Sequence, residues 1–282
     1  MNQSFDTFDT ADTAACEAII SSYNTYGGIM DDCPWPSKSM IESLLMAIRN
    51  LLFPGYFDPN PIRDIRTTTL ETLATIRSLL HTGLTDTRLA KTSGQAHAVV
   101  DQFFQYIPTL RSILKTDQMA TFDGCPAANH PDEVIVAYPG FWAILVYRVA
   151  HFLYQQGVPF IPRVMTEIAH SDTGIDIHPQ ATIGGHCFID HGTGIVIGQT
   201  ARIGQHVSLY QGVTIGALRI PRRGNNANEK RHPTIEDSVT IYARTTILGG
   251  DTVIGAQSII GGNLWITASV PAKSRLVNKA IQ

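Results

Sequence analysis

Aliphatic residues return at every sixth position through most of the C-terminal half of the chain. An α-helix repeats at about 3.6 residues and a β-strand at about 2, so a period of six matches neither element alone. The period is typical of a solenoid of short parallel strands, in which each side of a coil points one aliphatic side chain into a stacked core. Three columns carry it: Ile177, Ile183, Ile189 and Ile195; Ile197, Ile203, Leu209 and Ile215; and Ile235, Ile241, Ile247, Val253 and Ile259, with Ile254, Ile260 and Ile266 one residue out of step beside the last. We therefore predict a parallel β-helix from Ile175 to Ile266.

The first part of the chain shows helical periodicity instead. Apolar residues at helical spacing, bounded by proline and glycine, predict helices over residues 13–26, 37–53, 68–80, 95–116, 140–156 and 162–170. Pro108 should kink or divide the fourth helix, because proline lacks the N–H that an interior turn needs. Residues 116–131 should be less regular, since Gly124, Pro126 and Pro131 interrupt a helix.

These patterns predict an α+β protein, with a helical domain (1–165) before a β-helix domain (166–282). The last helix should cover the open edge of the first coil. The repeats are interrupted once, by the polar and basic residues 218–231, and a loop of this length inside a tight solenoid is more often functional than decorative. Beyond Ile266 the period is lost, and the chain ends in a basic tail from Lys273 to Gln282.

Composition narrows the class of protein. Hydrophobic residues make up 44% of the 282 residues and charged residues 16%, which is typical of a soluble globular protein. The net charge of −3 gives no indication of a nucleic acid or membrane-surface partner. We expect no signal peptide and no membrane span. The four cysteines, Cys16, Cys33, Cys125 and Cys187, form no CxxC pair, so we expect reduced thiols in a cytoplasmic protein.

His191 is the first candidate for chemistry. It follows Asp190, and Asp176 lies 15 residues before it. A coil of three six-residue sides takes roughly 18 residues, so Asp176 lies within about one coil of His191. A neighbouring carboxylate can orient an imidazole and stabilise its protonated form, as a general base requires. The competing interpretation is a surface histidine in a turn.

Metal and nucleotide binding are less well supported. His178, His186, His191, His206 and His232 are available, but no HxH or HxxxH pair occurs, so no metal is expected. No GxGxxG or Walker motif is present. Small residues flank the insert at Gly216, Ala217 and Ala243, where a slender ligand could lie against the backbone, although tight packing explains them equally well. Lys273 is among the basic residues that could meet phosphates.

Several motifs together resemble those of the serine O-acetyltransferases, a family with hexapeptide repeats. The likeness covers the repeat region and reaches back through residues 138–141 and 147–151. Its parts are Gly174-Ile175-Asp176-Ile177-His178-Pro179, Ile189-Asp190-His191-Gly192-Thr193-Gly194, Tyr210-Gln211-Gly212-Val213-Thr214-Ile215-Gly216-Ala217 and Arg231-His232-Pro233-Thr234-Ile235. Hexapeptide repeats alone are unspecific, but the DIHP, DHGTG and RHP pieces in combination are highly specific.

The resemblance implies a left-handed β-helix enzyme that makes O-acetylserine from acetyl-CoA and serine for cysteine synthesis. His191 would be the general base, with Asp176 as its carboxylate partner. Asp190, Arg231 and His232 would hold the amino acid, Arg231 through its carboxylate. The pantetheine arm would lie near Ala217 and Ala243. Such relatives place the site between subunits of a homotrimer, and their helical domains join two trimers into a hexamer.

Two positions depart from the family pattern. Relatives read Gly-Asp-Pro-Ala where this chain reads Gly124-Cys125-Pro126-Ala127, so a neutral thiol stands where an aspartate helps to hold the ammonium group of serine. Asp123, two residues away, could take its place. Family members that dock to cysteine synthase commonly end in isoleucine, whereas this chain ends in Gln282, which disfavours docking.

Three hypotheses follow. The first is a serine acetyltransferase. The second is the same acetyl transfer to another small hydroxy compound, because of Cys125. The third is a weakly catalytic homologue that serves as a binding or regulatory scaffold, against which the intact set of Asp176, Asp190, His191 and Arg231-His232 argues.

Overall fold

The structure, a computed structural model, describes residues 10–26, 35–58, 62, 64–85, 92–219 and 229–277. Five features considered above lie wholly or partly outside the described residues: the N-terminal tail, Gly27-Gly28, Cys33, most of the 218–231 insert and the chain end at Gln282.

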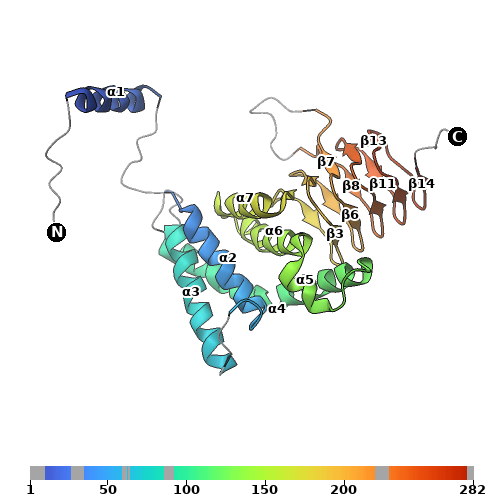
Figure 1. Ribbon diagram of the computed structural model, residues 1–282, viewed down its shortest axis with the longest axis horizontal. Helices are drawn as coiled ribbons and strands as arrows, with labels where there is room; N and C mark the ends of the chain where they lie inside the picture. The colour runs from blue at the N-terminus through green and yellow to red at the C-terminus, as the bar shows by residue number, and fades with distance from the viewer. Residues whose placement is uncertain are drawn as a thin grey trace.

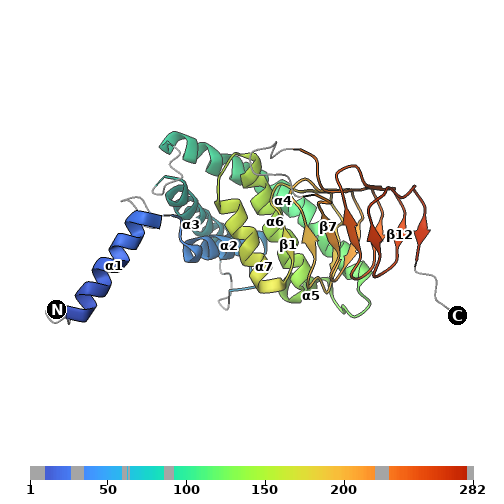
Figure 2. The same cartoon turned by 90° about the horizontal axis from the view of Figure 1, so that it is seen from above.

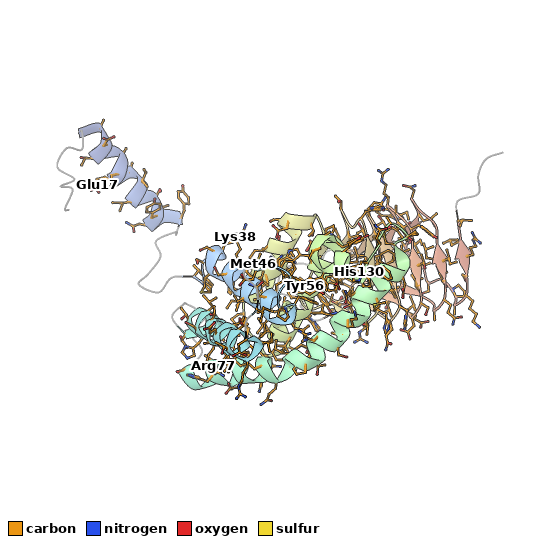
Figure 3. The ribbon with its side chains drawn as sticks, turned by 60° about the horizontal axis from the view of Figure 1, so that its bottom comes forward. Glu17, Lys38, Met46, Tyr56, Arg77 and His130 are labelled. Carbon is orange, nitrogen blue, oxygen red and sulfur yellow. The ribbon has the colours of Figure 1, made fainter. Side chains whose placement is uncertain are left out.

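Helices alone precede the repeats in the described part of the chain (Figure 1). They are α1 (Thr10–Tyr26), α2 (Lys38–Leu52), α3 (Ile65–Thr85), α4 (Ser93–Gly124), α5 (Pro131–Ala137), α6 (Pro139–Gln155) and α7 (Ile161–Thr173). Helix α1, which carries Glu17, stands apart from the other helices (Figure 3). Helix α2 begins as its sequence predicts, because the Ser37 side chain accepts a hydrogen bond from the Met40 N–H. No single helix among the described residues has both the length and the apolar character to cross a bilayer, and only the pair α5–α6, bent by 73°, meets that standard jointly.

Pro108 was predicted to kink or divide its helix; it does not divide it, and the kink stays a prediction. Helix α4 is one continuous element of 32 residues with Pro108 inside it. Pro108 is exposed, while Phe103 and Leu110 pack the opposite face of the helix into the core. The helix also continues to Gly124, beyond the expected end near residue 116. It ends where the Phe188 ring lies against Gly124, at a distance of 2.5 Å from where a Cβ would stand.

The repeat region is a parallel β-solenoid of three sheets, as predicted. We name each sheet by its first strand. The β1 sheet has the order β1-β4-β7-β10-β13, the β2 sheet β2-β5-β8-β11 and the β3 sheet β3-β6-β9-β12-β14. The strands are β1 (Asp176–Ile177), β2 (Thr182–Ile183), β3 (Phe188–Asp190), β4 (Val196–Ile197), β5 (Arg202–Ile203), β6 (Ser208–Tyr210), β7 (Thr214–Gly216), β8 (Thr234–Ile235), β9 (Thr240–Ile241), β10 (Thr246–Leu248), β11 (Val253–Ile254), β12 (Ile259–Ile260), β13 (Trp265–Ile266) and β14 (Arg275–Leu276). The left hand of the coil stays a prediction.

Two details of the repeat prediction need correction. In the third column the inward position changes after Ile247, so that Ile254 and Ile260 are fully buried while Ile259 is 38% exposed. Ile254 lies seven positions after Ile247 instead of six, and the turn between them contains Gly249, which adopts a φ of +104°. The solenoid also continues past Ile266, because β14 pairs with β12 and completes a further coil.

Helices α4, α6 and α7 lie against the first coil (Figure 2). Helix α7 ends at Gly174, which has a φ of +71° and whose carbonyl accepts a hydrogen bond from Gly194 of the next coil at 2.8 Å. The helix therefore leads directly into β1 and covers the open end of the stack, as the sequence predicted.

A buried ion pair connects the helices to the first coil. The Arg148 guanidinium of α6 donates to both carboxylate oxygens of Asp117 of α4, at 2.6 and 2.9 Å. Arg148 also donates to the carbonyl oxygens of Ile183 and Gly184, at 3.2 and 2.8 Å. Asp117 in turn accepts the backbone N–H of Cys187 at 2.9 Å. Two helices and the first coil thus share one charged network.

Replacing Asp117 with Ala is expected to lower the free energy of unfolding by about 3–5 kcal/mol, because it leaves the Arg148 charge buried without compensation. Urea unfolding followed by circular dichroism measures the change. Asp101→Ala is the matched control, since Asp101 pairs with Arg77 on the surface and its loss should cost less than about 1 kcal/mol. Equal losses for the two variants would contradict the role given to the buried pair.

Candidate active site

His191 and the Arg231-His232 pair lie on two different edges of the triangular solenoid. The turns from the β3 sheet to the β1 sheet form what we call the His191 edge, which includes His191, Gly212 and Ala243. The turns from the β1 sheet to the β2 sheet form the His232 edge, which includes Gln199 and His232. Within one chain the β1 sheet separates the two edges.

His191 occupies a strained turn at an exposed position. Its backbone has a φ of +56°, in the left-handed region that residues other than glycine seldom adopt. The turn continues through Gly192, where a Cβ would lie only 2.4 Å from the Ile175 side chain, so glycine is required there. The His191 side chain is 71% exposed, and its Nε2 atom lies 3.5 Å from Oδ2 of Asp190. This places an accessible imidazole next to a carboxylate.

Asp176 has a different partner in this chain. Its Oδ1 atom accepts a hydrogen bond from Arg163 of α7 at 3.1 Å, and Arg163 also pairs with Glu167. Within the described ranges, Asp176 makes no hydrogen bond or ion pair with His191. The pairing of Asp176 with His191 therefore stays a prediction.

Glu167, His170 and Asp176 form a group whose potential ligand atoms lie within 4.8 Å of one another. Arg163 pairs with both carboxylates of this group, so one of their two negative charges is compensated within the chain.

Tyr138, which the sequence analysis did not single out, contacts Cys125 and is influenced by the charge of Asp190. The Cys125 Sγ atom lies 3.3 Å from the Tyr138 hydroxyl. This hydrogen bond, together with burial and with the charges of Cys125, Glu133 and Asp190, raises the pKa of Tyr138 to about 12. Burial also raises the pKa of Tyr210 of β6, and Tyr242, Asp190 and Cys125 add to the effect.

The structure thus groups Cys125, Tyr138, Asp190 and Tyr210, brought from α4, the start of α6, β3 and β6. Asp123, the suggested substitute for the missing aspartate, is exposed, and its side chain makes no hydrogen bond or ion pair within the described part of the chain. The only sequence signal for the tyrosines was their place within the family-like motifs.

On the other edge, His232 is held as a neutral donor. The Thr200 backbone N–H donates to its Nδ1 atom at 3.1 Å, and since an amide can only donate, the proton of the neutral ring must be on Nε2. Burial lowers the pKa of His232 to about 4, helped by the charges of Arg231, Lys230 and His178. The ring lies over Gly198, where a Cβ would come within 2.0 Å of it. His232 therefore offers an N–H donor at neutral pH.

Arg231 is fixed by the coil beneath it. Its backbone N–H donates to Thr200 Oγ1 at 2.9 Å, and its guanidinium donates to Gln199 Oε1. Sequence reasoning named Arg231 and His232 but missed Gln199 and Thr200, which lie 32 residues earlier in the chain.

The four residues predicted to bind the co-substrate do not meet in one chain. Gly216 and Ala217 begin the His232 edge, Ala243 lies on the His191 edge, and Lys273 lies on the third edge, between the β2 and β3 sheets. A cavity of about 550 Å³ lies on the His232 edge, with Arg219, Lys230 and Arg231 among its lining residues.

The chain is similar to several serine acetyltransferases. The chain is 42% identical over 260 residues to a plasmid-encoded serine acetyltransferase of Synechococcus elongatus, covering 86% of this chain and 81% of that protein. It is 45% identical over 129 residues to serine acetyltransferase of Bacillus subtilis, where the match spans 57% of that protein's length. The solved structure of serine acetyltransferase 1 of Entamoeba histolytica in complex with L-cysteine superposes with a TM-score of 0.74 and 32% identity, covering 95% of this chain and 99% of that one. No family model matches the sequence.

A parallel β-solenoid of six-residue repeats, with an exposed imidazole–carboxylate pair on one edge and an Arg-His pair on another, defines an acyltransferase of the hexapeptide-repeat class. Within that class, the chain belongs to the serine acetyltransferase family.

Proposed function

We propose that this enzyme transfers the acetyl group of acetyl-CoA directly to the hydroxyl of L-serine, giving O-acetylserine for cysteine biosynthesis. The observation that carries the proposal is the 42% identity to a serine acetyltransferase over 86% of the chain, combined with the exposed His191 beside Asp190. The co-substrate, the site and the assembly described below are parts of the same proposal.

His191 is the general base. It takes the proton from the serine hydroxyl as the oxygen attacks the thioester carbonyl. The tetrahedral oxyanion then collapses, the carbon–sulfur bond breaks, and the imidazolium returns the proton to the departing thiolate. Asp190 lies close enough to stabilise the imidazolium, and Asp176 does so once its carboxylate is released from Arg163.

The amino acid is held by groups from both edges. Asp190 attracts the ammonium group, while the Arg231 guanidinium and the Nε2–H of His232 donate to the carboxylate. Because the β1 sheet separates His191 from Arg231 in one chain, a complete site requires two protomers. This supports a homotrimer with a site at each seam. The helical domains then join two trimers, and the enzyme works in the cytoplasm.

Acetyl-CoA lies along the same seam. The small residues Gly216, Ala217 and Ala243 let the pantetheine arm approach the backbone, and Lys273 meets phosphate. Arg219, Lys230 and Arg231 supply positive charge around the adjoining cavity of about 550 Å³.

A thiol-release assay with acetyl-CoA and a panel of small hydroxy acceptors tests the activity. Turnover with serine is the expected result. Turnover only with another acceptor would show that Cys125 has changed the specificity, and no turnover with any acceptor would indicate a scaffold.

Replacing Cys125 with Asp is expected to lower the KM for serine by about tenfold, because a second carboxylate near Asp190 strengthens the hold on the ammonium group. The KM for acetyl-CoA should not change. Cys16→Asp on the exposed helix α1 is the matched control and should leave both constants unchanged. An unchanged KM for serine in Cys125→Asp would remove residue 125 from the acceptor site.

A further inference from the structure

We propose that Tyr154 of helix α6 is a positioning residue for substrate: through Gln180 and Gln199 it holds the Arg231 guanidinium in the orientation that binds the carboxylate of serine. We call these four residues the Tyr154 relay. The inference rests on the proposed role of Arg231, and it adds residues that lie outside the family-like motifs.

Three hydrogen bonds make up the relay. The Tyr154 hydroxyl donates to Gln180 Oε1 at 2.6 Å. The Gln199 amide NH₂ donates to the same oxygen, and the Arg231 guanidinium donates to Gln199 Oε1. Tyr154 lies near the end of α6, while Gln180, Gln199 and Arg231 lie in successive turns of the His232 edge. The relay therefore runs from the helices across three coils to the candidate site.

Donor chemistry fixes the direction of every bond in this series. A guanidinium can only donate, so Gln199 must present its oxygen to Arg231. Its NH₂ group is then directed at Gln180, which must present its own oxygen. Tyr154, facing that same oxygen, has to act as donor. One arrangement of the two amides satisfies all four side chains, and reversing either amide would place two donors face to face.

Tyr154 is the end of the series that the fold holds most firmly. Its backbone is within α6, and its ring meets the His178 ring edge-on, with centroids 6.2 Å apart. All four relay side chains are partly buried, so water competes for them less than at the surface. Without the hydroxyl, the Gln180 oxygen accepts a hydrogen bond from Gln199 alone. Both glutamine side chains can then rotate more freely, so Arg231 is held less firmly.

Tyr154→Phe removes the hydroxyl and keeps the ring. We expect the KM for serine to rise by about threefold to tenfold, the effect of one hydrogen bond, with kcat and the KM for acetyl-CoA nearly unchanged. L-Serinamide, which keeps the hydroxyl and ammonium groups but lacks the carboxylate, should show an unchanged kcat/KM. A purely structural defect would lower activity with both acceptors alike. Tyr106→Phe is the matched control. Tyr106 of α4 stacks on Phe152, which lies on α6 like Tyr154, and the Tyr106 hydroxyl makes no hydrogen bond within the described part of the chain.

A double-mutant cycle tests the connection itself. Gln199→Leu alone should raise the KM for serine by about tenfold to a hundredfold, because it removes an acceptor from a charged donor. Adding Tyr154→Phe to Gln199→Leu should then have almost no further effect, since the relay is already broken. If the two substitutions instead raise the KM for serine by the product of their separate effects, the proposal is overturned. If Tyr154→Phe lowers the thermal midpoint, Gln180→Met breaks the relay at its centre and must give the same pattern.

Arg231→Ala separates failure of this inference from failure of the proposed site. If Arg231→Ala removes the preference for serine over serinamide and Tyr154→Phe leaves it intact, the relay is wrong and the role of Arg231 stands. If Arg231→Ala also leaves the preference intact, Arg231 does not bind the carboxylate, and both proposals fall together.

Discussion

Replacing His191 with Asn is expected to lower kcat by about 10²–10⁴-fold, the usual cost of losing a general base. Asparagine suits the test because it tolerates the φ of +56° at this position, so the turn keeps its shape while the base is lost. A thiol-release assay under saturating serine and acetyl-CoA measures the change, and the KM values for both substrates should move little.

The chain offers a close control for this substitution. His206 occupies an equivalent left-handed turn, with a φ of +58°, on a different edge of the solenoid, where its ring stacks on that of His186. His206→Asn should leave turnover unchanged. Comparable losses in the two variants would mean that the strained turns, and not the imidazole of residue 191, account for the effect.

Mixing two inactive variants is expected to restore activity. If each site takes His191 from one protomer and Arg231 from its neighbour, His191→Asn and Arg231→Ala homotrimers should each be nearly inactive. Random reassembly of equal amounts then gives about one intact site in four, because half of the chains supply each functional residue. Activity should therefore return to about a quarter of the wild-type level after joint unfolding and refolding.

The double variant His191→Asn/Arg231→Ala, refolded with an equal amount of wild-type chain, calibrates the experiment. It should also retain about one intact site in four, since both residues of a site must then come from wild-type chains. Recovery in this control but not in the mixture of single variants would place both residues of a site in the same protomer. It would contradict the proposal that each site lies between two protomers.

The sequence was most informative where the structure repeats. The period of six residues predicted the solenoid. Members of the three predicted columns, such as Ile183, Ile203 and Ile235, stack on one another in the β2 sheet. The errors occurred where the period changes locally. One extra residue between Ile247 and Ile254 shifted the inward column, and a list of aliphatic positions alone cannot distinguish that shift from two parallel columns. Pro108 does not divide α4, where it lies on the exposed face of the helix.

For the candidate site, residue types were predictable and their partners were not. Asp190 next to His191 follows from chain order, but Arg163 as the partner of Asp176 requires the path of α7 across the first coil. Gln199 and Arg231 are 32 residues apart because the insert lengthens one coil, so no regular spacing predicts their contact. Contacts between neighbouring coils depend on loop length, which the six-residue pattern does not contain.

The buried pair of Arg148 and Asp117 has a consequence for how the protein loses its structure. It ties carbonyl and amide groups of the first coil to two helices, and one continuous apolar core runs from α2 to the last strands. A repeat array normally frays from its ends in small steps, because each repeat contacts only its neighbours. Here the first coil is fastened to a packed helical base, so the helices and the first coils form one cooperative foldon, and fraying is confined to the distal coils.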